Sequence, residues 1–195
     1  MSSPIARDVA AKLDSGFAKE APLLVLGRRL TVFVTNKGAC MATIDMHENT
    51  TATPEEFVAA LTDFGPGRAN LFPNSADNNL KVHDRGPTYA DVTEGSSGIW
   101  ERLHYDWSDP NRVVMTTTDS NLWGGSSGHT YTFTQKPDGT TDVDVVVVRE
   151  GKNLKGRLLG AVVGTVGKSR LTKAFDTTVK AIEARAEGAR APEQP

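Results

Sequence analysis

Cysteine is almost absent from this sequence, which bears on both the fold and the location of the protein. Cys40 is the single cysteine among the 195 residues, so no disulfide can form within the chain. Unpaired thiols are typical of reducing compartments, and we therefore expect a cytoplasmic protein. The 4 histidines are scattered, without the close His or Cys spacing of a metal site. We expect no metal ion, and no motif indicates a cofactor.

Long apolar runs and an excess of charge of one sign are also missing. The apolar run Leu158–Val166 is far shorter than the roughly 20 residues that a helix needs to span a bilayer. The net charge of −2 provides no electrostatic footprint for nucleic acid. A signal peptide is not indicated, because Asp8 and Asp14 intervene and the charged and apolar regions stand in the wrong order. The sequence predicts neither a transmembrane segment nor a nucleic-acid partner, and it specifies no oligomeric state.

Two short matches to catalytic or nucleotide-binding motifs are excluded by the residues around them. Gly167-Lys168-Ser169 resembles the end of a P-loop, but Val162 stands where the upstream glycine is required. Residues 124–128 match the G-x-S-x-G pattern of serine hydrolases, which needs a strand before the serine and a helix after it. A strand pattern follows instead, at 129–134. We therefore expect neither a P-loop nor a serine nucleophile.

From Met41 onwards, strand patterns alternate with turn signals. Residues 42–51 predict a strand, and Thr53-Pro54-Glu55-Glu56 has the cap, proline and acidic first turn of a helix start. A second short helix is predicted at 68–71. Six further strands follow between turns, at 80–84, 89–94, 99–107, 112–120, 128–135 and 140–149. This order predicts an α+β fold in which a curved antiparallel sheet of about seven strands wraps around a long C-terminal helix.

The C-terminal run from Asn153 to Glu187 divides into two halves. The second half places apolar residues on one helix face, namely Leu171, Phe175, Val179 and Ile182. In the first half the same face carries Gly156, Gly160, Gly164 and Gly167. Glycine costs a helix about 0.5–1 kcal/mol relative to alanine, so four glycines need a reason. Either the helix breaks near Gly164–Gly167, or the glycines leave a cavity above the sheet.

The chain divides into three parts. We expect an N-terminal extension at 1–40, one domain at 41–187 and a disordered tail at 188–195. Apolar residues recur every four positions within 4–19, which is typical of a short amphipathic helix. Two interpretations of residues 1–40 stand side by side: an extension outside the core, and a segment with a fixed place in it.

Alternation along the last two strands predicts which side chains face the helix. In residues 128–135 the threonines suit solvent, which turns His129, Tyr131 and Phe133 inward. In residues 140–149 the aspartates suit solvent. The inward side chains there are Val143, Val145, Val147 and Arg149, with Arg149 near a rim.

The faces of residues 99–107 conflict. Leu103 and Tyr105 lie on the plainer core face. The opposite face would bring Trp100, Arg102 and His104 inward, although an exposed ion pair is the commoner role of such an arginine and an ordinary strand position that of such a histidine. Trp123 stands beside two glycines, and we interpret it either as a loop lid over a cavity mouth or as an ordinary hairpin corner.

Several short sequence segments resemble those of a known superfamily. They are Ala52–Phe57 after the first strand, Trp100-Glu101-Arg102, Tyr105–Pro110, and Val148–Gly151 before the long helix. These segments are similar to the START/Bet v 1-like helix-grip (SRPBCC) superfamily, in particular its polyketide cyclase/dehydrase branch, over residues 41–187. The resemblance implies a cavity between sheet and C-terminal helix that holds apolar or aromatic ligands, with catalysis in some members.

Three functions are therefore weighed. The first is binding of a small hydrophobic ligand, lipid- or polyketide-like, by Trp100, Trp123, His129, Tyr131, Phe133, Val145, Val147, Gly160 and Gly164. The second is a polyketide cyclase or dehydratase of aromatase type, with catalytic candidates Arg102, His104, His129 and Tyr131. The third is a membrane-surface or protein-binding module that uses the basic C-terminal helix and its apolar residues Leu154, Leu158 and Val162.

Overall fold

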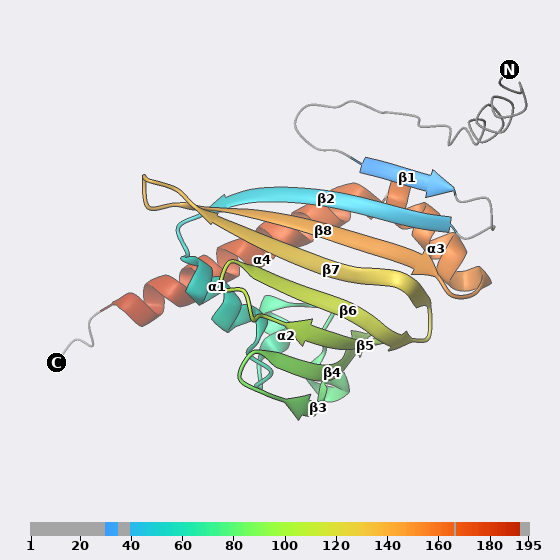
Figure 1. The fold of residues 1–195 in the computed structure, drawn as a ribbon, viewed down its shortest axis with the longest axis horizontal. Helices are drawn as coiled ribbons and strands as arrows, with labels where there is room; N and C mark the ends of the chain where they lie inside the picture. Colours follow the sequence, from blue (N-terminus) through green and yellow to red (C-terminus); the bar gives the residue numbers. More distant parts are fainter. Residues whose placement is uncertain (1–29, 35–39, 166, 192–195) are drawn as a thin grey trace, which may run out of the picture.

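The computed structural model describes residues 30–34, 40–165 and 167–191, and it shows one antiparallel sheet with helices against one face (Figure 1). The strand order is β1-β2-β8-β7-β6-β5-β4-β3. The strands are β1 (Leu30–Val34), β2 (Cys40–Thr50), β3 (Lys81–Arg85), β4 (Tyr89–Ser96), β5 (Ile99–Asp106), β6 (Arg112–Ser120), β7 (Trp123–Gln135) and β8 (Thr141–Gly151). The helices are α1 (Pro54–Leu61), α2 (Arg68–Leu71), the 3-10 helix η1 (Asp77–Asn79), α3 (Leu154–Thr165) and α4 (Gly167–Arg190).

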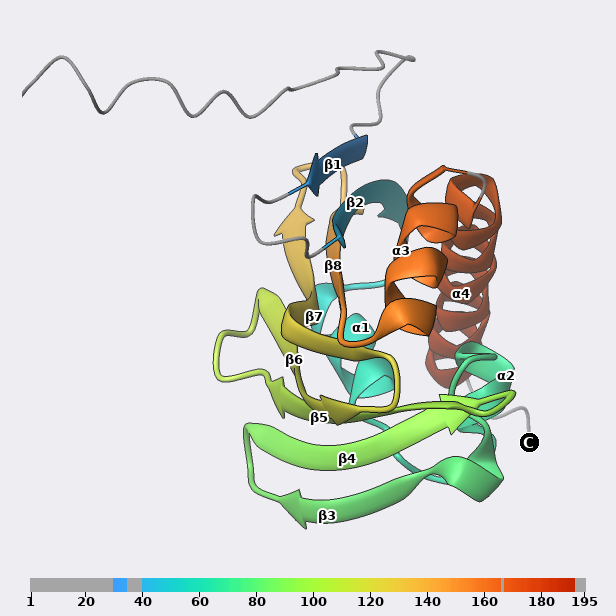
Figure 2. The same cartoon turned by 90° about the vertical axis from the view of Figure 1, so that its right-hand side faces the viewer.

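The sheet curves so that its concave face receives the C-terminal helices. Figure 2 shows the bend between the β1-β2-β8 end and the β5-β4-β3 end, with α3 and α4 beside the concave side. The predicted α+β fold is confirmed: seven strands fall within the predicted domain or begin at its edge. An eighth strand, β1, comes from residues 30–34 and pairs antiparallel with β2. The predicted helix at 4–19 lies outside the described residues.

Local sequence explains why α1 starts where it does. The Thr53 hydroxyl accepts a hydrogen bond from the Glu56 backbone N–H, and the Glu56 carboxylate accepts one from the Thr53 N–H. This capping box satisfies two otherwise orphaned donors of the first turn. Pro54 occupies the first turn, where its missing N–H costs nothing. The helix starts at Pro54, as the sequence predicts.

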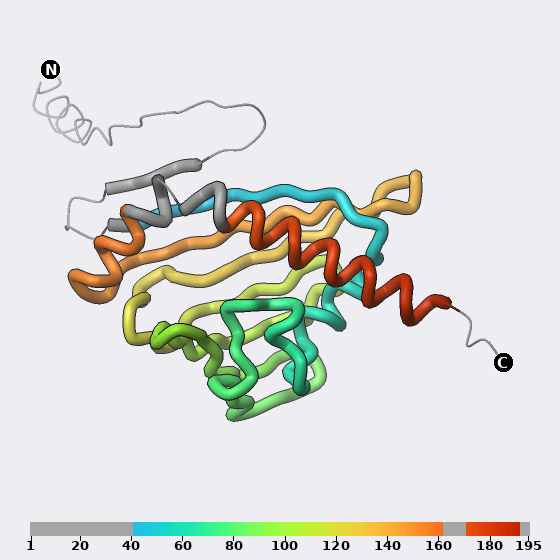
Figure 3. The backbone as a smooth tube through the Cα atoms, turned by 180° about the vertical axis from the view of Figure 1, so that it is seen from behind, coloured from blue at the N-terminus to red at the C-terminus, as the bar shows by residue number. Residues whose placement is uncertain are grey.

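The C-terminal run forms two helices, which run in different directions (Figure 3). α3 ends at Thr165 and α4 begins at Gly167, and residue 166 between them lies outside the described residues. Gly156 faces the connection between β6 and β7: a Cβ there would lie 2.2 Å from the carbonyl oxygen of Leu122. The role of this glycine is therefore close backbone contact, and it leaves no cavity. Gly164 and Gly167 lie among the residues whose side chains the structure does not describe.

The helix α4 grips the sheet through the face that the sequence predicts. Phe175, Val179 and Ile182 are at most 5% exposed, and Leu171 packs against the same core. Burial of each such side chain contributes about 1.5–3 kcal/mol. The helix continues to Arg190, beyond the predicted start of a tail at residue 188, and the Arg190 guanidinium binds the Glu56 carboxylate of α1.

Candidate functional site

The candidate site lies on the concave face where β7 crosses the middle of the sheet. His129 and Tyr131 sit two residues apart and therefore point to the same side. Across the ladder to β8, His129 lies opposite Val147 and Tyr131 opposite Val145. Across the ladder to β6, their partners are Met115 and Val113. Two polar groups thus stand in a row between apolar walls. Phe133, next along β7, is buried in the core.

A buried ion pair closes one end of this row. Arg149 is 9% exposed, and its two terminal nitrogens each lie 3.0 Å from a carboxylate oxygen of Glu101. The Thr117 hydroxyl donates a further hydrogen bond to Glu101, at 3.0 Å. The guanidinium also stacks over the ring of Trp123, 5.3 Å from its centre. Burial lowers the pKa of Arg149, and the adjacent Glu101 carboxylate opposes that effect. The bidentate pair keeps both charges satisfied.

The same arginine determines the state of His129. Nη2 of Arg149 donates to Nε2 of His129, so the imidazole proton resides on Nδ1. Burial, and then the positive charge of Arg149, hold the pKa of His129 well below its usual range. The imidazole is therefore neutral near pH 7. Among the residues that the structure describes, Nδ1 has no hydrogen-bond partner, and the side chain remains partly exposed.

Tyr131 is the second polar group of the row. Its hydroxyl has no hydrogen-bond partner within the described part of the chain, and its side chain is also partly exposed. Burial, followed by the negative charge of Glu94, raises the pKa of Tyr131 to about 12. The phenol therefore stays protonated near pH 7 and can donate a hydrogen bond. Together, Nδ1 of His129 and the Tyr131 hydroxyl offer two neutral donors to a bound molecule.

A second buried network lies beyond Tyr131 and is fully occupied by the protein itself. The Arg68 guanidinium donates to Glu94, to Ser75 and, at 3.0 Å, to the Tyr105 hydroxyl. Nη1 of Arg68 donates to the backbone oxygens of Leu61 and Asp63. Tyr105 in turn donates to Glu94, at 2.6 Å. The Arg68 guanidinium, the Tyr105 hydroxyl and the Glu94 carboxylate all have partners within this network. The network therefore holds α2 against β4 and β5.

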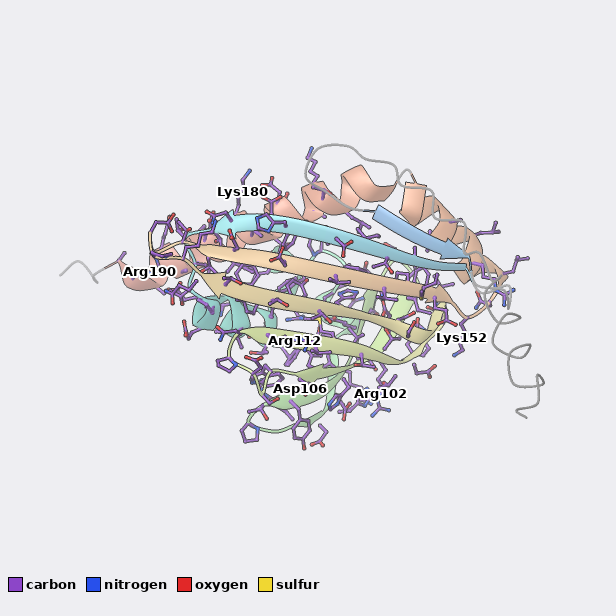
Figure 4. All side chains as sticks on the ribbon, turned by 45° about the horizontal axis from the view of Figure 1, so that its top comes forward. Arg102, Asp106, Arg112, Lys152, Lys180 and Arg190 are labelled. Carbon is purple, nitrogen blue, oxygen red and sulfur yellow. The ribbon has the colours of Figure 1, made fainter. Side chains whose placement is uncertain are left out.

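Three predicted site residues lie on the other face of the sheet. Trp100 is 38% exposed, and Arg102 and His104 alternate with the buried Leu103 and Tyr105. The expectation that they face the helix is wrong, because Leu103 and Tyr105 take the core side of β5. Figure 4 labels Arg102 on the outer surface.

His104 has its own partners on that outer surface. Its Nδ1 lies 3.1 Å from Asp91, and its ring stacks on Tyr89 with 5.9 Å between centres. These contacts account for His104 as an ordinary, half-buried strand residue. Of the four catalytic candidates, the structure brings together His129 and Tyr131 alone.

Trp123 is part of the site wall. It is the first residue of β7 and 5% exposed, so the interpretation as a loop lid is wrong. The glycine-rich residues after it pair with β8, and the register shifts between Gly124 and Gly128. A Cβ on Gly160 would lie 3.8 Å from the Trp123 ring, so α3 packs directly above this tryptophan. Gly164 lies outside the described side chains.

Sequence reasoning missed Glu101, Arg68 and Glu94. The sequence does contain a signal for Glu101, because Glu101 shares a strand face with Leu103 and Tyr105. A carboxylate on that inward face requires a partner such as Arg149. For Arg68 and Glu94 no local pattern indicates burial. In the described residues, no group of His, Cys, Asp and Glu could hold a metal ion. Among those same residues, no helix is long and apolar enough to cross a membrane.

The architecture is that of a known fold. A curved antiparallel sheet that holds a C-terminal helix against its concave face, with short helices after the first core strand, is the START-like helix-grip fold. No protein-family model matches the sequence. No curated protein matches it either.

Solved structures confirm the fold. The Zhui aromatase/cyclase from Streptomyces sp. R1128 matches with a TM-score of 0.58 and 14% identity, over 78% of this chain and 97% of its own. A START superfamily protein from Mycobacterium smegmatis matches with a TM-score of 0.55 and 14% identity, over 75% and 98%. The di-domain aromatase/cyclase StfQ of the steffimycin biosynthetic pathway matches with a TM-score of 0.54 and 13% identity, over 75% and 51%.

Proposed function

We propose that this protein binds a small, neutral hydrophobic or aromatic ligand, lipid- or polyketide-like, between the concave face of the sheet and the C-terminal helices. One observation carries the proposal. Within the described part of the chain, Nδ1 of His129 and the Tyr131 hydroxyl have no hydrogen-bond partner, and they stand in a row that is otherwise lined by Met115, Val145 and Val147. Polar groups on an inward face usually have partners, so two adjacent groups without one favour a ligand that supplies it. The likeness of the fold to START and aromatase/cyclase structures supports the same proposal.

The charges around the row favour a neutral ligand. Both inward arginines, Arg68 and Arg149, are already neutralised by Glu94 and Glu101. An anionic ligand would have to compete with one of these carboxylates, and a buried charge without a partner is costly. A ligand with an apolar body and a carbonyl oxygen would instead accept from Nδ1 of His129 and from the Tyr131 hydroxyl. Such a group leaves both ion pairs intact.

The test combines recovery of a natural ligand with a matched pair of variants. Native mass spectrometry of the protein purified from its own host would identify a bound neutral molecule. In binding titrations with apolar probes that carry a ketone, we expect Tyr131→Phe to weaken binding by about tenfold, because one hydrogen bond is lost. Tyr89→Phe, on the outer face, should bind as the wild type does. Consistently empty protein without affinity for any apolar probe would overturn the proposal.

The alternative is a polyketide cyclase or dehydratase of aromatase type. It is favoured by the same donor pair, because two neutral donors that converge on a carbonyl would polarise it toward enolisation or aldol closure. In this case His129 and Tyr131 are the catalytic residues, and Arg102 and His104 take no part because they lie on the outer face. Cyclised product from a poly-β-keto thioester, with a strongly reduced kcat for Tyr131→Phe and an unchanged kcat for His104→Phe, would support the enzyme. If the protein binds this thioester without converting it, the result would favour a carrier or sensor over an enzyme.

A further inference from the structure

The outer face of α3 carries the two most exposed large apolar side chains of the described residues. Leu154 is 73% exposed and Leu158 is 62% exposed, whereas the other exposed large apolar residues lie between 37% and 40%. The two leucines stand four residues apart and therefore share one side of the helix. The opposite side, with Gly156 and Gly160, packs on the sheet. Figure 1 shows α3 at one end of the molecule, and in Figure 2 α3 stands between the strands and α4.

Basic side chains border this apolar strip on both sides. At about 100° per residue, Lys155 projects on one flank of the leucines and Arg157 on the other. Both are exposed, and neither forms an ion pair with any described residue. The surrounding sequence strengthens the pattern, since Gly151–Phe175 contains no Asp or Glu. Its basic residues are Lys152, Lys155, Arg157, Lys168, Arg170 and Lys173.

We propose that the outer face of α3, defined by Leu154, Leu158, Lys155 and Arg157, docks on an anionic phospholipid surface. Apolar side chains flanked by lysine and arginine are typical of helices that lie in the plane of a membrane interface. The apolar strip enters the boundary of the acyl chains, and the two basic side chains bind lipid phosphates. No described helix could cross the membrane, so the contact is peripheral.

Charge favours a membrane over a second copy of the chain. In a symmetric dimer through this face, the basic residues of one copy would approach those of the other, with no acidic residue on α3 to compensate. An anionic bilayer offers the complementary charge. The inference is independent of ligand binding, because the docking residues point away from His129 and Tyr131. It also places the candidate site close to the membrane, since the glycine side of α3 covers Trp123.

The experiment is co-sedimentation of the full chain with vesicles, measured at low and high salt. We expect binding to vesicles that contain phosphatidylglycerol, little binding to pure phosphatidylcholine, and loss of binding in high salt. Leu154→Gln with Leu158→Gln should weaken partitioning by about tenfold or more, and so should Lys155→Glu with Arg157→Glu. All four positions are exposed, so the variants should fold as the wild type does, which circular dichroism would verify.

Two control pairs distinguish this face from general effects of surface change. Val82→Thr with Val146→Thr removes exposed apolar surface elsewhere. Arg112→Glu with Lys180→Glu makes the same change in charge at distant positions, which Figure 4 labels on β6 and α4. Both control pairs should bind like the wild type. The proposal is overturned if the wild type ignores anionic vesicles, or if the controls lose as much binding as the α3 variants. It is also overturned if sedimentation shows a dimer that Leu154→Gln with Leu158→Gln dissociates, without any vesicle binding.

Discussion

Arg149 donates to Nε2 of His129 while it holds both carboxylate oxygens of Glu101, so one guanidinium sets the tautomer of the histidine and, after burial, helps to keep it neutral. A neutral imidazole with its proton on Nδ1 is the consequence. This arrangement turns a residue that could switch near neutral pH into a fixed hydrogen-bond donor.

The first prediction concerns the pH dependence of stability. The pKa of His129 is well below the ordinary 6.5, so between these two values the unfolded chain binds more protons than the folded chain. Stability from this group is therefore complete above about pH 6.5 and falls as pH decreases below it, by at most about 1.4 kcal/mol per pH unit. Urea unfolding at pH 7.5, 6.5 and 5.5 should show this loss in the wild type.

A matched pair isolates the histidine responsible. His129→Asn should reduce the loss of stability between pH 6.5 and 5.5, because the titrating group is gone. His104→Asn should retain it, since His104 lies half-buried on the outer face and is paired with Asp91. Equal pH dependence in both variants would contradict the role of His129.

The second prediction compares two tyrosines on the concave face. Tyr105→Phe should destabilise the protein by about 1–3 kcal/mol, because Arg68 and Glu94 both lose a buried partner. Tyr131→Phe should change stability by less than about 0.5 kcal/mol, because its hydroxyl has no partner in the described residues. Denaturant unfolding of the two variants gives the comparison directly. A large loss in Tyr131→Phe would show that the protein itself uses this hydroxyl, and would weaken the proposed site.

Much of the fold could be predicted because its signals are local. The capping box at Thr53 and the turns between strands each act within a few residues, and they fixed the start of α1 and most strand positions. Side-chain alternation also placed His129, Tyr131 and Phe133 on the inner face, because the threonines between them suit water.

The remainder depends on contacts between distant residues. Trp123 and the glycines after it have the composition of a turn, yet pairing with β8 extends the strand through them. In β5 the inward Glu101 breaks the apolar alternation, and only its bond to Arg149, 48 positions further on, explains its place. The Arg68 network likewise joins α2 to two strands and has no local signature. The site residues on β7 could therefore be predicted, because alternation within one strand determines which side chains face inward. The residues whose position depends on contacts between different strands could not.

The third prediction separates two glycines in the C-terminal helices. A Cβ at position 156 would lie 2.2 Å from the Leu122 oxygen and 3.2 Å from Gly151 Cα, so Gly156→Ala must push α3 away from the sheet. We expect a loss of about 2 kcal/mol or more, as for other overpacked contacts. Gly188→Ala meets no atom within 4 Å and should stabilise α4 by about 0.5–1 kcal/mol. Thermal unfolding of both variants distinguishes close packing from helix propensity.

The last prediction concerns the buried ion pair that orients His129. Glu101→Leu leaves the Arg149 guanidinium buried without its carboxylate, and we expect a loss of about 3–5 kcal/mol. The double variant Glu101→Leu with Arg149→Met removes both charges and should recover most of that stability, because a well-packed apolar pair often replaces a buried ion pair at little cost. It also removes the donor to Nε2, so the His129 pKa should rise as the neighbouring positive charge disappears. NMR titration of the imidazole would measure that rise. If the double variant is as unstable as Glu101→Leu, the cost lies in lost packing around Trp123. An unchanged pKa of His129 in the double variant would show that Arg149 does not control the state of His129.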